Sequence, residues 1–257
     1  MSPLRIAVLH PLATAAQGDE GNARVLARRA DLRGIRSTVT WVHQGAVPEA
    51  DIYLVGGLDD DRMPVLAQRL RAGGLAERVS GGAVVLAVNA GYQVLGHSYV
   101  APDGARHAGL GLIDVRSSRS TSPFLGPVIT RPDPALGLAA LSGYESHHGT
   151  TDVGPGAVAF VALELGHGND GEHDGARQGH IIGTYVHGPL LARNADLADL
   201  LLIWGTGAPL VDAPSPTADA LRSQRITEDR ADPTGWGGRV YGRARRRSRP
   251  RLGTRGS

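Results

Sequence analysis

The sequence predicts an α/β protein with a doubly wound, mostly parallel sheet and a more β-rich second half. Short apolar runs alternate with helical stretches over the first part of the chain, which is typical of β-α-β units. Several of these runs end directly on Gly or Asn, residues suited to turns at the ligand-binding edge of such a sheet. The composition is 41% hydrophobic but only 4% aromatic, so the core must consist mainly of Leu, Val, Ala and Ile.

The first half is predicted to run strand, helix, strand, strand, helix, strand, helix. Its apolar and β-branched runs favour strands, and its 3.6-residue periodicities favour helices. The expected strands are residues 4–10, 37–42, 51–55 and 83–88, and the expected helices are residues 22–32, 63–71 and a stretch beginning at Asn89. Because the carboxyl ends of parallel strands lie at the same edge of the sheet, Gly56-Gly57 and Asn89 should lie near each other.

The second half has shorter runs separated by Gly, Pro and polar clusters. We expect mainly β-structure in residues 109–130 and 157–186, and an exposed hairpin tip or loop at residues 166–179. A last helix is expected at residues 195–204. Residues 1–207 are therefore predicted to form one domain.

Residues 208–257 form a Pro-, Ala- and Arg-rich extension, predicted to be partly disordered with a helical stretch at residues 218–226. Residues 239–257 hold eight arginines and no acid, whereas the preceding chain has 19 arginines against 25 acidic residues. A basic tail of this kind could bind nucleic acid, but we favour a solvated tail and consider nucleic-acid binding unlikely.

Composition also limits the chemistry. The chain has no cysteine, which excludes disulfides, thiolate metal ligands and cysteine catalysis. It has no apolar stretch of about 20 residues and no signal-like N-terminus, so we expect a cytoplasmic protein without a membrane span.

The most informative feature is Asn89, which follows the apolar run of residues 83–88 and precedes a predicted helix. A strand, a sharp turn and a helix form a nucleophile elbow, where backbone N–H groups can hold an oxyanion. Asn tolerates positive φ and can keep this shape, but its delocalised carboxamide cannot act as a nucleophile. The alternative is that Asn89 is only the turn residue of an ordinary βα unit.

Histidines give weaker signals. His187 ends another short apolar run, where it could be a general base or a structural residue. Adjacent His147 and His148 would point to opposite faces of a strand, which argues against a metal site around Glu145. The acid- and His-containing stretch of residues 167–174 is interpreted as a solvated loop.

Six sequence blocks, taken together, are much more specific. From residue 4 to about residue 207 the chain resembles the class I glutamine amidotransferases of the cobyric acid synthase type, and among them the GatD branch, the glutaminase subunits of lipid II isoglutaminyl synthase. The blocks are GDEGN (18–22) with RGI (33–35), VGGLDD (55–60), AGYQVLG (90–96), GLGLID (109–114), GYESH (143–147) and GTYVHGPLL (183–191).

The resemblance implies specific roles for residues at the elbow and its surroundings. A cysteine at the elbow would attack the glutamine side chain, so Asn89 stands in the nucleophile position and His187 in that of the base. Gly57 and Ala90 would supply oxyanion-hole N–H groups. The acid usually found two residues after the histidine is absent, because Pro189 stands there, so a dyad is implied.

Two further residues are implied to bind substrate. Gln93 lies on the elbow helix, and Arg119 is the candidate for the α-carboxylate of glutamine, which a guanidinium can bind with two hydrogen bonds. The resemblance implies L-glutamine as substrate, no metal and no cofactor. It also implies a Mur-ligase-like, ATP-using partner that receives ammonia and amidates D-glutamate of lipid II.

The residue at position 89 limits how much of this function transfers. With Asn89 in place of the nucleophile we expect little or no glutaminase turnover. A laboratory substitution, a natural loss of activity and a rewired site are all compatible with the sequence. A pseudoenzyme that binds glutamine, or that only scaffolds a partner, is the main alternative function.

Overall fold

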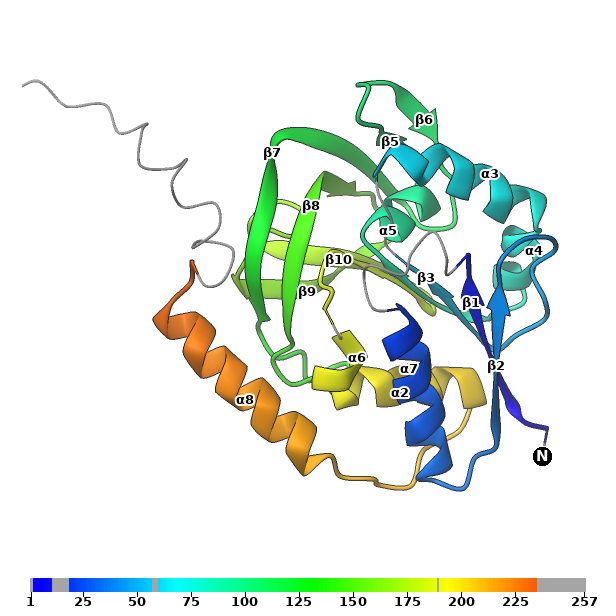
Figure 1. The fold of residues 1–257 in the computed structure, drawn as a ribbon, viewed down its shortest axis with the longest axis vertical. Helices are drawn as coiled ribbons and strands as arrows, with labels where there is room; N and C mark the ends of the chain where they lie inside the picture. The colour runs from blue at the N-terminus through cyan, green and yellow to red at the C-terminus, as the bar shows by residue number, and fades with distance from the viewer. Residues whose placement is uncertain (1, 11–18, 57–59, 189, 235–257) are drawn as a thin grey trace, which may run out of the picture.

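The structure is a computed structural model, and it describes residues 2–10, 19–56, 60–188 and 190–234. The described strands join in the spatial order β2-β1-β3-β4-β11-β10-β9-β7-β5-β6, with β8 paired to β7 (Figure 1). Strands β2, β1, β3, β4 and β11 are mutually parallel. This is the flavodoxin-like strand order with β11 in fifth place, so the predicted fold class is confirmed.

The parallel half matches the predicted order closely. One six-residue helix, α4, was not predicted, because a helix this short between glycine pairs carries little periodic signal. The strands are β1 (Leu4–Leu9), β2 (Ser37–Val42), β3 (Ile52–Val55), β4 (Val84–Val88) and β11 (Ile181–Thr184). The helices of this half are α2 (Asp19–Asp31), η2 (Asp60–Arg62), α3 (Met63–Ala72), α4 (Leu75–Ser80) and α5 (Ala90–Leu95).

Helices cover both faces of the parallel strands, as Figure 1 shows, with α2 and α7 (Ala195–Thr206) on one side and α3 and α5 on the other. The side chains of β4 alternate between these two layers. Val84, Leu86 and Val88 pack in the cluster that contains α2 and α7, and Val85 and Ala87 pack in the cluster that contains α3 and α5. A strand buried on both faces needs a continuous apolar run, which is why β4 was readily predicted.

The second half is rich in β-structure, as predicted, and the structure shows that its described strands pair antiparallel apart from one short parallel pairing between β5 and β7. Its strands are β5 (Ser98–Val100), β6 (Arg106–Ala108), β7 (Val115–Thr130), β8 (Ser142–Val153), β9 (Val158–Leu165) and β10 (His173–Gln178). A register shift between Arg119 and Phe124 interrupts the β7–β8 ladder.

The prediction of an exposed loop at residues 166–179 was partly wrong. Residues 173–178 form β10, which lies between β9 and β11, and Asn169 and Asp174 are buried. Asn169 donates to the carbonyl of Gly175, and Asp174 accepts the backbone N–H of Tyr185. Polar residues can occupy the interior here because these hydrogen bonds replace those lost to water.

The extension contributes helix α8 (Pro216–Ala231), which packs against α6 (Leu190–Arg193) and β8. Arg230 of α8 pairs with Glu164, and Arg222 pairs with Asp196. The helix is longer than the predicted stretch of residues 218–226, while residues 235–257 lie outside the described residues. Within the described chain, no helix combines the length and apolar character needed to cross a bilayer.

Candidate functional site

Asn89 forms a strained turn between β4 and α5. Its φ is 50° and its ψ is −117°, and its backbone N–H donates to the carbonyl of Thr184 at 2.9 Å. The other non-glycine residue with positive φ in the described chain is His10, directly after β1. Such backbone conformations cost about 1–3 kcal/mol each and cluster at functional sites. Both residues follow parallel strands, so the strain lies at the carboxyl edge of the sheet.

Close packing fixes this elbow in place. A Cβ on Gly91 would lie 2.4 Å from the carbonyl oxygen of Val55 and 2.9 Å from that of Gly56. The start of α5 therefore rests directly on the backbone that follows β3. Gly57, the predicted oxyanion-hole residue, lies outside the described residues.

His187 emerges beside the elbow. Thr184 pairs in register with Val88, so the chain after β11 leaves the sheet next to Asn89. The backbone of His187 exchanges hydrogen bonds with Tyr144 at 2.8 and 3.0 Å, and the two rings meet edge to face at 5.7 Å between centroids. The structure thus brings the predicted nucleophile and base positions to the same edge of two adjacent strands.

The environment of His187 keeps its ring neutral. Burial lowers the pKa of His187 to about 4, with a further lowering by the charge of His147 and an opposing effect of Glu145. Its Nε2 is buried and has no hydrogen-bond partner among the described residues. A neutral imidazole with a free nitrogen can accept a proton, as a general base requires. A thiolate beside it would favour the imidazolium form, but Asn89 carries no such charge.

Glu145, to which the sequence pattern gave no chemical role, is a buried anchor on β8. Its carboxylate accepts the backbone N–H groups of His167 at 2.8 Å and Gly168 at 2.9 Å, and lies 3.3 Å from Nε2 of His147. Nδ1 of His147 faces the carbonyl of Gly149 at 3.0 Å and so carries a proton. The contact between Glu145 and His147 makes them a buried side-chain pair on β8.

This pair supports the segment that carries His187. The ring of His147 stacks on Tyr185 with 3.8 Å between centroids, and the Tyr185 hydroxyl lies 2.7 Å from that of Thr151. Asp174 accepts the N–H of Tyr185 at 3.1 Å, together with the hydroxyl of Thr184. Burial raises the pKa of Asp174 to about 6. No local sequence signal could have revealed this layer, because its members are far apart in the chain.

Arg119 forms an ion pair with Asp60, and the two side chains are 23% and 25% exposed. On β7, Arg119 stands opposite Gly149 of β8, where a Cβ would lie 2.2 Å from the Tyr185 hydroxyl. Burial, with a contribution from the charge of Asp60, raises the pKa of Tyr185. The ion pair therefore lies beside Tyr185, near the elbow.

The remaining predicted residues, Ala90 and Gln93, are on α5 and are 1% and 4% exposed. The backbone N–H of Gln93 donates to the carbonyl of Asn89 at 3.1 Å, which begins the helix. The N–H of Ala90 precedes that first helical bond and has no acceptor within the helix. This is where an oxyanion-hole donor is expected, and its role stays a prediction.

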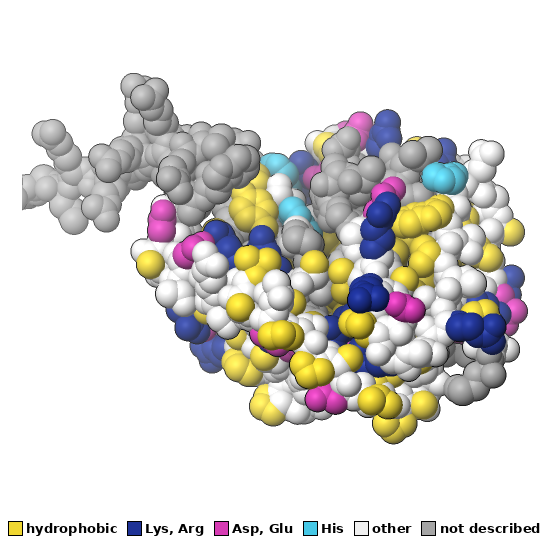
Figure 2. All heavy atoms as spheres, turned by 60° about the horizontal axis from the view of Figure 1, so that its bottom comes forward, with side chains coloured by type: hydrophobic (Ala, Val, Ile, Leu, Met, Phe, Trp, Pro, Cys, Tyr) yellow, Lys and Arg dark blue, Asp and Glu magenta, His cyan; other side chains and the backbone are white. Residues whose placement is uncertain are grey.

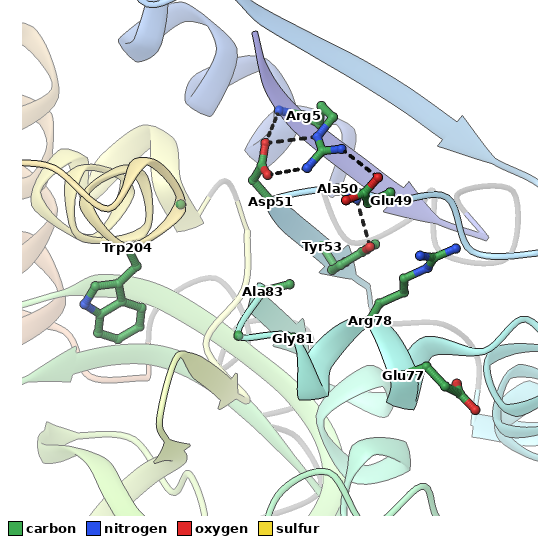
Figure 3. Close-up of a pocket in the computed structure, with 12 residues that line it drawn as sticks. Arg5, Glu49, Ala50, Asp51, Tyr53, Glu77, Arg78, Gly81, Ala83 and Trp204 are labelled. Carbon is green, nitrogen blue, oxygen red and sulfur yellow. Dashed lines mark hydrogen bonds and ion pairs between the residues drawn. The ribbon is translucent and has the colours of Figure 1, made fainter. Parts of the chain in front are cut away.

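A cavity of about 290 Å³ lies at the opposite, amino edge of the sheet (Figure 3). There Arg5 binds Asp51 at 2.8 Å and Glu49 at 3.2 Å, and the Tyr53 hydroxyl donates to the carbonyl of Pro48 at 2.7 Å. These polar groups already pair with one another. The cavity is separate from the site around Asn89.

On the face shown in Figure 2, arginine side chains lie among acidic and hydrophobic ones. The large hydrophobic side chains that are exposed in the described chain come from separate parts of the fold, for example Leu32 directly after α2, Val158 on β9 and Leu221 on α8. Neither feature defines a single interaction surface.

The fold and the elbow define a class I glutamine amidotransferase domain. Residues 5–195 match the model of the CobB/CobQ-like glutamine amidotransferase domain, and the chain belongs to this family. Among its relatives, the subunit GatD of lipid II isoglutaminyl synthase (glutamine-hydrolyzing) from Staphylococcus aureus is 30% identical over 189 residues, covering 72% of this chain and 76% of the relative. The corresponding subunit of Streptococcus pneumoniae is 29% identical over 238 residues, covering 89% and 91%.

Solved structures agree on the fold. A crystal structure of a glutamine amidotransferase has a TM-score of 0.53 at 17% identity and covers 78% of this chain and 98% of its own. The structure of PurLQS from Thermotoga maritima has a TM-score of 0.54 at 11% identity, covering 79% and 99%. At such low identities the likeness concerns the fold alone.

Proposed function

We propose that this chain is the glutamine-binding amidotransferase subunit of a two-component enzyme of the GatD type. Its partner would be a Mur-ligase-like subunit that uses ATP in the cytoplasm to activate D-glutamate of lipid II and then accepts ammonia. The relatives from Staphylococcus aureus and Streptococcus pneumoniae, similar over most of their length, support this proposal. The observation that carries it is the emergence of Asn89 and His187 from adjacent parallel strands at one edge.

In a working site of this geometry, a thiolate at the elbow adds to the side-chain carbonyl carbon of glutamine. Backbone N–H groups such as that of Ala90 would hold the oxyanion, and His187 would deliver a proton to the departing ammonia. Water would then cleave the thioester and release glutamate. Asn89 cannot take the first step, because the lone pair of its amide nitrogen is delocalised. We therefore propose that this form is inactive or severely impaired.

The test measures ammonia release from L-glutamine by this chain and by Asn89→Cys, each with the ligase subunit present. Asn89→Cys should raise the rate by on the order of 10³-fold or more, since loss of a covalent nucleophile removes most of the rate in comparable hydrolases. Asn89→Ala should resemble the unaltered chain, and adding His187→Gln to Asn89→Cys should abolish the gain. Robust turnover by the chain with Asn89 would contradict the proposal.

A second candidate is a natural pseudoenzyme that binds glutamine, or scaffolds the partner, without hydrolysis. The intact elbow geometry at Asn89 favours it, because the site keeps its shape without its nucleophile. Titration calorimetry with L-glutamine separates the two versions, since a pure scaffold need not bind the ligand.

A further inference from the structure

A buried carboxylate lies beside the end of β11. Asp174 is 1% exposed and belongs to β10, the strand next to β11 in the sheet. Its two oxygens accept different donors: Oδ1 accepts the backbone N–H of Tyr185 at 3.1 Å, and Oδ2 accepts the hydroxyl of Thr184. Neither bond involves the imidazole of His187, so Asp174 does not act as the acid of a triad.

These bonds satisfy backbone groups where the chain leaves the sheet. β11 ends at Thr184, and the next two N–H groups donate to side chains, that of Tyr185 to Asp174 and that of Val186 to the hydroxyl oxygen of Thr184 at 3.0 Å. All three residues of this segment are at most 1% exposed, so water is not an alternative partner. Because the Thr184 hydroxyl gives its proton to Asp174, its lone pairs are left for the N–H of Val186. The carboxylate thus fixes the backbone that leads to His187.

The same threonine holds the elbow. Its carbonyl accepts the backbone N–H of Asn89 at 2.9 Å, and it stands opposite Val88 in the parallel ladder. Thr184 therefore contacts the elbow through its main chain and Asp174 through its side chain. One carboxylate orients both the residue that holds Asn89 and the segment that carries His187.

Asp174 is itself held in place from the elbow helix. The side chain of Asn169 accepts the N–H of Gly175 at 3.2 Å and donates to its carbonyl at 2.7 Å, and the Tyr92 hydroxyl on α5 donates to Asn169 at 3.3 Å. Gly175 has a φ of 67°, and a Cβ there would lie 2.2 Å from the carbonyl oxygen of Gly183. Only glycine allows β10 to approach β11 this closely, which brings Asp174 within reach of Thr184.

The charge of Asp174 does not favour folding at neutral pH. Burial raises the pKa of this carboxyl to about 6, against the hydrogen bonds from Thr184 and Tyr185 that lower it. Since the folded pKa lies above the unfolded value, the contribution of Asp174 to stability is lost as the pH rises through 6. A carboxylate that served stability alone would be better replaced by a neutral group of the same shape. Strongly shifted carboxyls of this kind gather at functional sites.

We propose that Asp174 is a positioning residue that, through the hydroxyl of Thr184 and the N–H of Tyr185, sets the placement of the His187 imidazole relative to residue 89. Its role in turnover rests on the proposed function, but the placement can be measured without glutamine. Asn at position 174 would still accept the N–H of Tyr185. Its amide would donate to Thr184, however, and the hydroxyl proton of Thr184 would lose its acceptor.

The first test uses a single introduced thiol. The chain has no cysteine, so the rate at which iodoacetamide alkylates Asn89→Cys reports on position 89 alone. Beside His187 this thiol should have an apparent pKa below the ordinary value of about 8.5, and adding His187→Gln should restore that value. Adding Asp174→Asn should raise the apparent pKa by about one unit, which slows alkylation near pH 7 on the order of 10-fold.

Thr184 provides an independent pair of variants. In the Asn89→Cys chain, Thr184→Val removes the hydroxyl and should raise the apparent pKa of the thiol as Asp174→Asn does. Thr184→Ser keeps the hydroxyl and should leave the pKa unchanged. The matched control for the loss of charge is Asp152→Asn, an exposed carboxylate on β8, which should also have no effect.

Stability separates positioning from a merely structural role. At pH 7.5 Asp174→Asn should unfold at a urea concentration no lower than the chain with Asp174, because a buried ion is removed. Earlier unfolding with an unchanged thiol pKa would overturn the proposal.

Hydrogen exchange tests the unaltered full-length chain, so the outcome does not depend on whether a variant folds. Followed by NMR, the N–H groups of Tyr185 and Val186 should exchange as slowly as that of Ile182, although they lie beyond the last residue of β11. Exchange as fast as in an unfolded peptide would show that the carboxylate does not hold this segment, and the proposal would fail.

Turnover distinguishes this proposal from the proposed function. With the ligase subunit and L-glutamine, Asp174→Asn should lower the kcat of Asn89→Cys on the order of 10-fold with little change in KM, since Asp174 orients groups and does not bind the ligand. If the thiol responds to Asp174 but no ammonia is released, the proposed function is overturned and the positioning role stands. If turnover is robust and neither thiol nor kcat responds to Asp174, the positioning role is overturned and the proposed function stands.

Discussion

The two edges of the parallel sheet have opposite properties. At the amino edge, Arg5 is paired with both Asp51 and Glu49, and the backbone there is relaxed. At the carboxyl edge, His10 and Asn89 adopt positive φ, and the buried Nε2 of His187 has no partner among the described residues. At the amino edge, these polar groups are paired with one another and contribute to stability. The carboxyl edge holds strain and an unpaired base, which are features of a reactive or binding site.

The largest effect should come from adding a single methyl group to the elbow. Gly91→Ala places its Cβ against the carbonyls of Val55 and Gly56, so backbone on both sides would have to move. We expect a loss of about 3 kcal/mol in the free energy of unfolding, measured by urea denaturation. Near the amino edge, the nearest atoms to the added Cβ of Gly205→Ala are side-chain atoms of Ile52 and Leu4, which can shift, so this variant should lose about 1 kcal/mol.

Gly126→Ala on β7 is the control for these substitutions, because no heavy atom lies within 4 Å of its added Cβ. Its free energy of unfolding should change by no more than about 0.5 kcal/mol. Equal losses for Gly91→Ala and Gly126→Ala would show that the elbow is not rigidly packed.

A smaller effect concerns the pH dependence of stability. The pKa of His187 is lowered to about 4 in the folded state, below the value of about 6.5 for an unfolded chain. The unfolded state therefore binds more protons in this range, and the contribution of His187 is complete above about pH 6.5 and declines as the pH falls towards 4. Since the residue is only half-buried, we expect about 1–2 kcal/mol rather than the full shift.

His187→Gln should flatten that part of the stability curve, measured by urea unfolding between about pH 4 and pH 7. Asp174 acts in the opposite direction, because burial raises its folded pKa to about 6. The contribution of Asp174 to the free energy of unfolding is present below its unfolded pKa and is lost as the pH rises through 6. Asp174→Asn removes this opposing effect, so the free energy of unfolding should rise more steeply with pH. An unchanged slope in His187→Gln would mean that the imidazole titrates normally.

The smallest effect is expected at the amino edge. Burial tends to raise the pKa of Asp51, but the hydrogen bonds from Arg5 outweigh it and lower the pKa overall. The contribution of Asp51 is therefore present above its unfolded pKa and is lost as the pH falls through the folded pKa. Because the pair is partly exposed, Asp51→Asn should cost about 1 kcal/mol or less at neutral pH.

Ligand binding distinguishes the two edges in the same variant. Asp51→Asn should leave the affinity for L-glutamine unchanged, measured by calorimetry beside the unaltered chain. A loss of affinity would show that residues at the amino-edge cavity affect ligand binding at the site around Asn89. It would contradict the conclusion that the carboxyl edge alone binds the ligand.

The sequence by itself determined the parallel sheet and the position of the elbow. Strands buried on both faces need continuous apolar runs, and such a run ending at Asn89 leaves few other interpretations. The same local rule placed His187 close to the carboxyl end of a strand, and β11 ends just before it, at Thr184. The tertiary structure alone decided that Asp174 is buried, that His147 stacks on Tyr185, and that Asp60 pairs with Arg119. These contacts join residues from distant parts of the chain. The local sequence around a polar residue does not indicate whether its side chain will form hydrogen bonds with water or with another side chain.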